Sequence, residues 1–191
     1  MNLATIEQIV PELREALCGR RFGRVFQLSK FDLAIDFRLS ESRYLFISVS
    51  PSDPRIYLIR RRLRDVERSS TGPFVFTNSL KKQLSNAWVV TVDQVAKERI
   101  IELNLEGEDE FGEHFKRSLV VQLTGRSANL FVTNDSGVIL DRLRETQGDG
   151  QEIGTKFNPP ARPATPAGVT TRRPGTLDGS LSEHLDRLDL E

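Results

Sequence analysis

Residues 31–60 read FDLAIDFRLSESRYLFISVSPSDPRIYLIR, and this stretch decides the fold class. In residues 31–37 a large apolar side chain occupies every second position, which is the period of a half-buried strand. Residues 43–49 are apolar on both faces, as expected of a strand in the middle of a sheet. Two prolines mark residues 50–54 as a loop, after which residues 55–60 return to a strand pattern. The stretch therefore predicts three successive strands.

The rest of the chain adds helices and further strands. Apolar residues at steps of three and four predict a helix over residues 3–17, either kinked at Pro11 or starting near Val10. A second short helix is expected over residues 76–85, with Thr77 as its N-cap. Additional strands are predicted at 88–92, 99–105, 117–123, 129–133 and 138–142, with a hairpin turn at 134–137.

These elements predict one domain over roughly residues 1–145, of the α+β class, with a mostly antiparallel sheet or sandwich and two short helices. Residues 146–180 hold five of the nine prolines and read as a linker or tail rich in proline and glycine. Residues 181–191 are expected to begin a further helical region, because their leucines share one helical face. A helix starting there suggests a fragment of a longer protein.

Composition limits the possible partners. The 191 residues contain 27 Lys and Arg and 27 Asp and Glu, so the net charge is zero. A stand-alone nucleic-acid binder is usually basic, so any RNA contact must come from a local patch. Cys18 is the only cysteine, which excludes an intrachain disulfide and favours a reducing compartment. Without a signal-peptide pattern or an apolar run of about 20 residues, we expect a cytoplasmic protein with no membrane contact.

The residues that usually carry metal or cofactor chemistry are sparse. His114 and His184 are far apart, and neither is near Cys18, which we interpret as a small buried apolar residue. Residues 19–23 lack the Gly-Lys-Ser/Thr element of a phosphate-binding loop. We therefore expect no metal site and no cofactor.

Several charged residues have both a functional and a structural interpretation. Six arginines between Arg55 and Arg68 could bind phosphate groups through their planar guanidinium, or form a solvated loop paired with nearby acids. Lys81 and Lys82 lie on the predicted second helix, where an exposed face is the default. Arg99 begins an otherwise apolar strand face, so it either anchors a partner or reaches water in a salt bridge. The acidic residues 106–113 read as a solvated hairpin.

Three segments resemble, in order and spacing, the signature blocks of one known family. They are Leu80-Lys81-Lys82-Gln83-Leu84, Glu98-Arg99-Ile100 and Thr124-Gly125-Arg126-Ser127-Ala128-Asn129. Leu17-Cys18-Gly19-Arg20-Arg21-Phe22 and Pro54-Arg55-Ile56-Tyr57-Leu58 extend the match. The chain is thereby similar to the N-terminal domain of the NFACT family, the fibronectin-binding A or RqcH-type proteins of ribosome-associated quality control.

The resemblance implies an RNA-binding module rather than an enzyme. Such proteins bind large ribosomal subunits obstructed by peptidyl-tRNA, and recruit tRNA to extend the stalled chain, with alanine in bacteria. The implied partners are large-subunit rRNA and tRNA, with no small-molecule substrate. The implied contact residues are Arg55, Lys81, Lys82, Glu98, Arg99, Arg126 and Asn129. The implied fold resembles the N-terminal domain of formamidopyrimidine DNA glycosylases, but Asn2 replaces their N-terminal proline nucleophile, so glycosylase chemistry is not expected.

The sequence departs from the family pattern at three carboxylate positions. Glu98 stands for the family's aspartate, Thr5 for an acidic residue in the first helix, and Gln122 for a glutamate. Each change removes or moves a carboxylate, which keeps a second hypothesis open, namely a diverged protein-interaction domain, adhesin-like or a scaffold, that recruits no tRNA.

Overall fold

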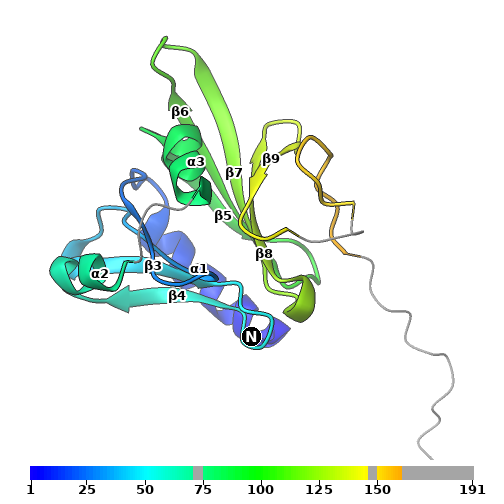
Figure 1. The fold of residues 1–191 in the computed structure, drawn as a ribbon, viewed down its shortest axis with the longest axis horizontal. Helices are drawn as coiled ribbons and strands as arrows, with labels where there is room; N and C mark the ends of the chain where they lie inside the picture. Colours follow the sequence, from blue (N-terminus) through cyan, green and yellow to red (C-terminus); the bar gives the residue numbers. More distant parts are fainter. Residues whose placement is uncertain (71–74, 146–149, 161–191) are drawn as a thin grey trace, which may run out of the picture. The chain divides into compact units, whose positions relative to one another are not determined.

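Two antiparallel sheets, each made of strands that follow one another in the chain, carry the fold (Figure 1). The computed structural model describes residues 1–70, 75–145 and 150–160. The first sheet contains β1 (Val25–Gln27), β2 (Asp32–Ile35), β3 (Arg43–Ser48) and β4 (Arg55–Arg60). The second contains β5 (Trp88–Gln94), β6 (Ile100–Glu108), β7 (His114–Gln122), β8 (Asn129–Asn134) and β9 (Ile139–Arg142). The predicted antiparallel α+β architecture is confirmed.

Three α-helices accompany the sheets in the described residues: α1 (Leu3–Leu17), α2 (Leu63–Ser69) and α3 (Val75–Leu84). The prediction of two helices is wrong, because α2 buries only Val66 and so shows no apolar periodicity in the sequence. Thr77 lies inside α3, so its prediction as an N-cap is also wrong. No helix in this part of the chain is long and apolar enough to cross a membrane.

Helix α1 continues through Pro11, which faces solvent. Asn2 caps the helix, because its side-chain oxygen accepts a hydrogen bond from the Thr5 amide at 2.8 Å. The alternative start near Val10 is therefore wrong. An interior proline costs about 3 kcal/mol, whereas each large apolar side chain that a helix buries contributes about 1.5–3 kcal/mol. Four side chains of α1 are buried: Ile6, Val10, Leu13 and Leu17.

The inner faces of both sheets share one hydrophobic core with α1 and α3. The strand register sets which side chains enter this core: Ile47 pairs with Ile56 and both point inward, whereas the neighbouring pair Phe46 and Tyr57 lies on the outer face. Helix α1 contacts β5 and β4, and α3 contacts β1 and β9. The core residues of the five-stranded sheet include Ile101, Leu103, Leu105, Leu119, Val121, Leu130 and Val132.

A buried polar contact ties the chain after β9 to the five-stranded sheet. Gln122 and Gln151 are almost completely buried, and the Gln151 amide donates a hydrogen bond of 2.9 Å to the Gln122 side-chain oxygen. Nearby, the rings of Phe131 and Phe157 lie 5.1 Å apart. Both contacts remove side chains from water, and they hold residues 150–160 against the sheet.

The compact unit consequently extends to Pro160, beyond the domain end expected at residue 145. The proline- and glycine-rich composition of residues 146–180 predicts poor packing of the segment as a whole. It does not show which individual side chains pack against the five-stranded sheet. The remainder of the predicted linker 146–180, and the helical region predicted at 181–191, lie outside the described residues.

Asn129 is the most heavily bonded polar side chain at this end of the sheet. Its amide nitrogen donates to the Arg144 carbonyl at 2.9 Å, and its oxygen accepts from the amides of Leu130 and Arg144, both at 2.9 Å. The side chain is completely buried. Loss of this amide would leave three backbone groups without a partner, away from water.

We therefore expect Asn129→Ala to lower the free energy of unfolding by about 2–3 kcal/mol. Asn78→Ala is the matched control, because Asn78 is exposed on α3 and should change the stability by less than about 0.5 kcal/mol. Urea unfolding of both variants measures the difference. An Asn129→Ala variant as stable as the control would contradict the structural role.

Glu102 lies on the outer face of the five-stranded sheet, directly opposite Asp93 on β5. Partial burial, and to a smaller extent the Asp93 carboxylate, raises the pKa of Glu102. The folded state therefore holds this proton at a pH where the unfolded chain has already released it. Stability is lost as the pH rises from the ordinary glutamate pKa through the raised one.

Glu102→Gln should be more stable than the unaltered chain at neutral pH, because the amide cannot ionise. The difference should shrink toward zero below about pH 4, where the glutamate is protonated in both states. Thermal unfolding at a series of pH values checks this. A variant that is less stable at pH 7 would show that the carboxylate is favourable where it lies.

Candidate nucleic-acid interface

Two turns bring Glu98, Arg99 and Arg126 to the same end of the five-stranded sheet. The Leu123 amide donates a hydrogen bond of 2.8 Å to the Arg99 carbonyl, which joins the turn between β5 and β6 to the connection between β7 and β8. Arg99 is half-buried and precedes β6, one residue outside the strand in which it was expected. Its guanidinium makes no hydrogen bond or ion pair with the described residues, so it is available to a ligand.

Arg126 lies in the short 3-10 turn η2 (Gly125–Ser127). Its side chain is exposed, and no described residue binds its guanidinium. Gly125 has φ +66°, a backbone conformation that side chains disfavour, so glycine suits the turn that presents Arg126. The glycine of the motif thus has a conformational role, and the arginine is the group free to bind.

Arg144 is a third cation at this end, and no motif in the sequence predicts it. Its Nη1 donates to the Arg126 carbonyl at 3.3 Å and also to the Ala128 carbonyl. The guanidinium lies 5.4 Å from the Phe31 ring, and burial lowers the pKa of Arg144. Lys30 contacts the same ring at 5.5 Å. The β1–β2 turn of the first sheet therefore meets the ends of β7 and β8 through Phe31 and Arg144.

Asn129 is a correction to the sequence prediction. The structure buries it completely and uses its amide to hold Arg144 in place. It therefore cannot contact RNA directly in this conformation. The sequence does not reveal this burial, because the Arg144 backbone that covers Asn129 lies fifteen residues further along the chain and only the fold brings it there.

The other predicted contact residues lie on different elements. Arg55 begins β4, where its guanidinium pairs with Asp53 and lies 5.7 Å from the Phe46 ring. Lys81 and Lys82 are exposed on α3 without a described partner, as expected of a solvated helix face. The predicted contact residues thus lie in three places: one group at the end of the five-stranded sheet, Arg55 on β4, and the two lysines on α3.

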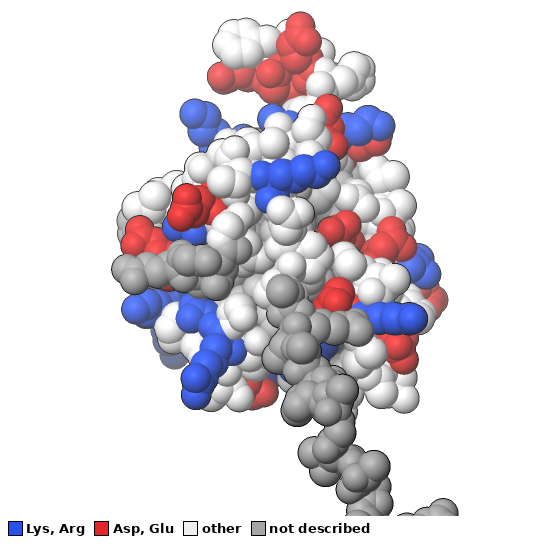
Figure 2. All heavy atoms as spheres, turned by 90° about the vertical axis from the view of Figure 1, so that its right-hand side faces the viewer, with Lys and Arg blue, Asp and Glu red and all other residues white. Residues whose placement is uncertain are grey.

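The surface as a whole is not basic. Figure 2 shows acidic side chains gathered at one tip of the molecule, with both signs of charge mixed over the rest of that face. The acidic segment forms the predicted hairpin between β6 and β7, in which Lys116 pairs with Glu106 at 2.8 Å and His114 with Glu108 at 3.5 Å. Contact with a polyanion must therefore be local, as the zero net charge predicts.

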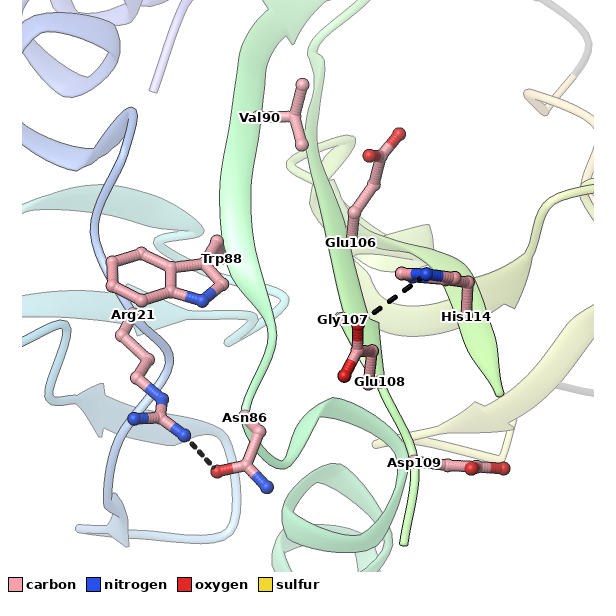
Figure 3. A pocket seen from close by; sticks show the side chains of 9 residues that line it. All are labelled: Arg21, Asn86, Trp88, Val90, Glu106, Gly107, Glu108, Asp109 and His114. Carbon is pink, nitrogen blue, oxygen red and sulfur yellow. Dashed lines mark hydrogen bonds and ion pairs between the residues drawn. The ribbon is translucent and has the colours of Figure 1, made fainter. Parts of the chain in front are cut away.

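A groove of about 600 Å³ lies beside this hairpin (Figure 3). The Trp88 ring is half exposed there, with the Arg21 guanidinium 5.9 Å from its centroid, and Arg21 donates a hydrogen bond of 2.5 Å to Asn86. On the far side of the groove, Glu108 pairs with His114, Glu106 pairs with Lys116, and Asp109 accepts hydrogen bonds from the amides of its own turn. Among the described residues, no group of three His, Cys, Asp or Glu side chains is placed to hold a metal ion.

Comparison with known proteins places the chain in a family. A family model for NFACT N-terminal and middle domains matches residues 2–165. The Rqc2 homolog RqcH of Streptococcus pneumoniae serotype 2 (strain D39 / NCTC 7466) is 27% identical over 188 residues, which cover 97% of this chain and 33% of that protein. The Rqc2 homolog RqcH of Bacillus subtilis (strain 168) is 25% identical over 135 residues, which cover 70% of this chain and 23% of that protein. The chain thus spans at most 33% of the length of these two relatives.

Solved structures share the fold. The N-terminal domain of fibronectin-binding protein PavA from Streptococcus pneumoniae matches with a TM-score of 0.72 at 22% identity, covering 88% of this chain and 64% of that one. The fibrinogen binding protein from Staphylococcus aureus matches with a TM-score of 0.70 at 19% identity, and the match covers 82% of this chain and 55% of that one. These structural matches show the shared fold, and the family model, which covers most of the sequence, shows that the chain belongs to the family of NFACT N-terminal and middle domains.

Proposed function

We propose that this chain is an RNA-binding module of ribosome-associated quality control. It would bind the obstructed large subunit and tRNA, and so support C-terminal tailing of stalled nascent chains, with alanine as the added residue. Peptide transfer would belong to the ribosome, and the chain would be no enzyme. The relatives named as Rqc2 homologs support this assignment. The proposed location is cytoplasmic, where ribosomes work.

One observation carries the proposal: two guanidinium groups without a described partner, Arg99 and Arg126, share one end of a sheet. Arginine donates two hydrogen bonds in fixed geometry, which matches a phosphate group. Arg144 adds positive charge behind Arg126 and holds its turn in place. A phosphate backbone lying across this end would meet all three cations, which are fixed by the strand ends rather than by a long loop.

Glu98 would act differently from the arginines. A carboxylate next to Arg99 can orient its guanidinium or accept a hydrogen bond from a nucleotide base or ribose. Glutamate reaches one methylene further than the aspartate expected here in the family. This difference would change which tRNA group is contacted, while the positive surface stays intact. Lys81, Lys82 and Arg55 would add contacts from α3 and β4.

Arg99→Ala should weaken tRNA binding roughly tenfold, since a hydrogen-bonded contact to a charged group contributes more than about 1.4 kcal/mol. Arg126→Ala should act similarly. Each variant should also lower the slope of log affinity against log salt by roughly one, because one phosphate contact is lost. Fluorescence anisotropy with labelled tRNA at several fixed salt concentrations measures both quantities.

Arg38→Gln is the matched control for charge. Arg38 is exposed between β2 and β3, at the opposite end of the first sheet from Phe31, and should bind tRNA as the unaltered chain does. Equal losses of tRNA affinity in Arg38→Gln and Arg99→Ala would show that the effect comes from net charge alone. Unchanged affinity in both Arg99→Ala and Arg126→Ala would refute the proposed surface.

A protein-interaction domain is the second candidate, and the acidic hairpin favours it. Phe111 is 82% exposed at the tip, beside Asp109, Glu110 and Glu113. An exposed aromatic ring among carboxylates is suited to a basic protein partner. The similar structures named for fibronectin and fibrinogen binding make those two proteins the first to test.

Surface plasmon resonance with immobilised fibronectin or fibrinogen tests this candidate. If the hairpin is the interface, Phe111→Ser should abolish most of the binding, because an anchoring aromatic ring typically contributes about 2 kcal/mol or more. Phe111 is not part of the core, so the variant should fold normally. Binding that is absent, or that is the same in Phe111→Ser, would count against the hairpin as an interface.

A further inference from the structure

The outer face of the four-stranded sheet is only partly covered. Helix α2 packs Val66 against Phe26, Ala34 and Tyr44, beside β3 and β4 (Figure 1). Next to this contact lies a groove of about 320 Å³. Its lining includes side chains from β3, β4, α2 and the segment between β4 and α2. The function proposed above does not use this groove, apart from Arg55 at its edge.

An aromatic floor and a cation form one side of the groove. Phe46 and Tyr57 are paired across β3 and β4, with ring centroids 5.1 Å apart and planes inclined by 44°. The Arg55 guanidinium lies 5.7 Å from the Phe46 ring, and the Arg55 Nε is buried with no hydrogen-bond partner among the described residues. A buried donor without an acceptor is costly, and an oxygen-rich ligand would supply the acceptor.

The opposite rim of the groove is polar. It is formed by Arg61 before α2 and by Asp65 and Ser69 on α2. Arg61 is exposed, and its guanidinium has no described partner. The Ser69 hydroxyl donates to the backbone carbonyl of Asp65 at 2.8 Å. The exposed Asp65 carboxylate has only a distant contact with Arg64, at 4.0 Å, among the described residues, so it is open to a ligand. Donors and an acceptor therefore face the aromatic floor.

The surroundings of the groove are positively charged. Arg62 and Arg68 are exposed and have no described partner, and Arg60 reaches Glu41 only at 3.6 Å with both side chains largely exposed. Such surface pairs contribute little and leave the charge available. Charge alone favours a solvated loop for this arginine run, but the structure places two of its members, Arg55 and Arg61, in the lining of a concave aromatic site.

We propose that this groove binds an unpaired nucleotide of single-stranded RNA. The base would stack on Tyr57, against the Phe46 ring, while Arg55 and Arg61 contact the flanking phosphates. Asp65 and the Ser69 hydroxyl would accept or donate hydrogen bonds at the base edge. An acidic peptide would use the arginines but not the aromatic floor, so the rings favour RNA. The inference does not depend on the ribosomal role proposed above.

Binding of a labelled single-stranded RNA of about ten nucleotides to the 191-residue chain tests the proposal. Tyr57→Ala should weaken binding by roughly 5- to 100-fold, because one stacked base is lost. Tyr57→Phe keeps the ring and should retain the affinity within about twofold. Arg61→Gln should weaken binding and reduce the salt slope by about 0.7, the value for one phosphate of a single strand. Arg61 is exposed, so this variant tests the site even if Tyr57→Ala does not fold.

Two control variants match these changes elsewhere on the surface. Trp88→Ala removes an exposed aromatic ring, and Arg20→Gln removes an exposed arginine, both outside the groove. Both should bind the single strand as the unaltered chain does, and double-stranded RNA should show no dependence on Tyr57, since its bases are stacked within the helix. This pattern would support the groove as a single-strand site.

Three results would overturn the inference. The first is unaltered single-strand binding in Tyr57→Ala and Arg61→Gln. The second is an equal loss in these variants and in their controls. The third is displacement of the RNA by polyglutamate with the same dependence on Tyr57, which would identify the groove as a site for an acidic protein segment. Arg99→Ala, measured with tRNA, reports separately on the proposed ribosomal function.

Discussion

Burial of the two inner sheet faces against one another and against α1 is the interaction on which the rest of the structure depends. Neither sheet has a second apolar layer of its own for this face, so each covers the other. Helix α1 contributes four buried side chains to the shared core and contacts strands of both sheets. Because the core fixes the strands, their ends are fixed as well, and the charged turns at those ends have defined positions.

The candidate sites follow from that arrangement in two ways. At one end of the sheets, the turns carrying Arg99 and Arg126 are joined by a backbone hydrogen bond and supported by Arg144 and the buried Asn129. On the outer face of the first sheet, α2 is too short to cover all the side chains that point away from the core. The aromatic residues left beside it, Phe46 and Tyr57, then line a groove rather than a second core.

The sequence is informative where a pattern repeats. The alternation in residues 31–37, the apolar run at 43–49 and the turn at 134–137 each recur in the structure as a strand or hairpin. The sequence does not predict an element that depends on a single residue, such as α2, whose only buried side chain is Val66. Asn129 is wrongly predicted to contact RNA, because the burial of a single polar side chain leaves no periodic pattern in the sequence. Arg144 is missed because only the tertiary fold brings it to Phe31 and Arg126. The expected likeness to the glycosylase domain stays a prediction.

The hairpin between β6 and β7 continues beyond the shared core, and this extension divides the two strands into regions of different local stability. Up to Leu105 and Leu119 the strands contain completely buried side chains, whereas from Glu106 to Arg117 no side chain is completely buried. Phe115 is the apolar side chain of this outer part that packs against the core. With fewer buried side chains to hold it, the outer ladder is expected to exchange its amides with solvent faster than the inner ladder. The acidic tip is thus expected to be the less stable part of the hairpin, so that a partner could reshape it at little cost to the fold.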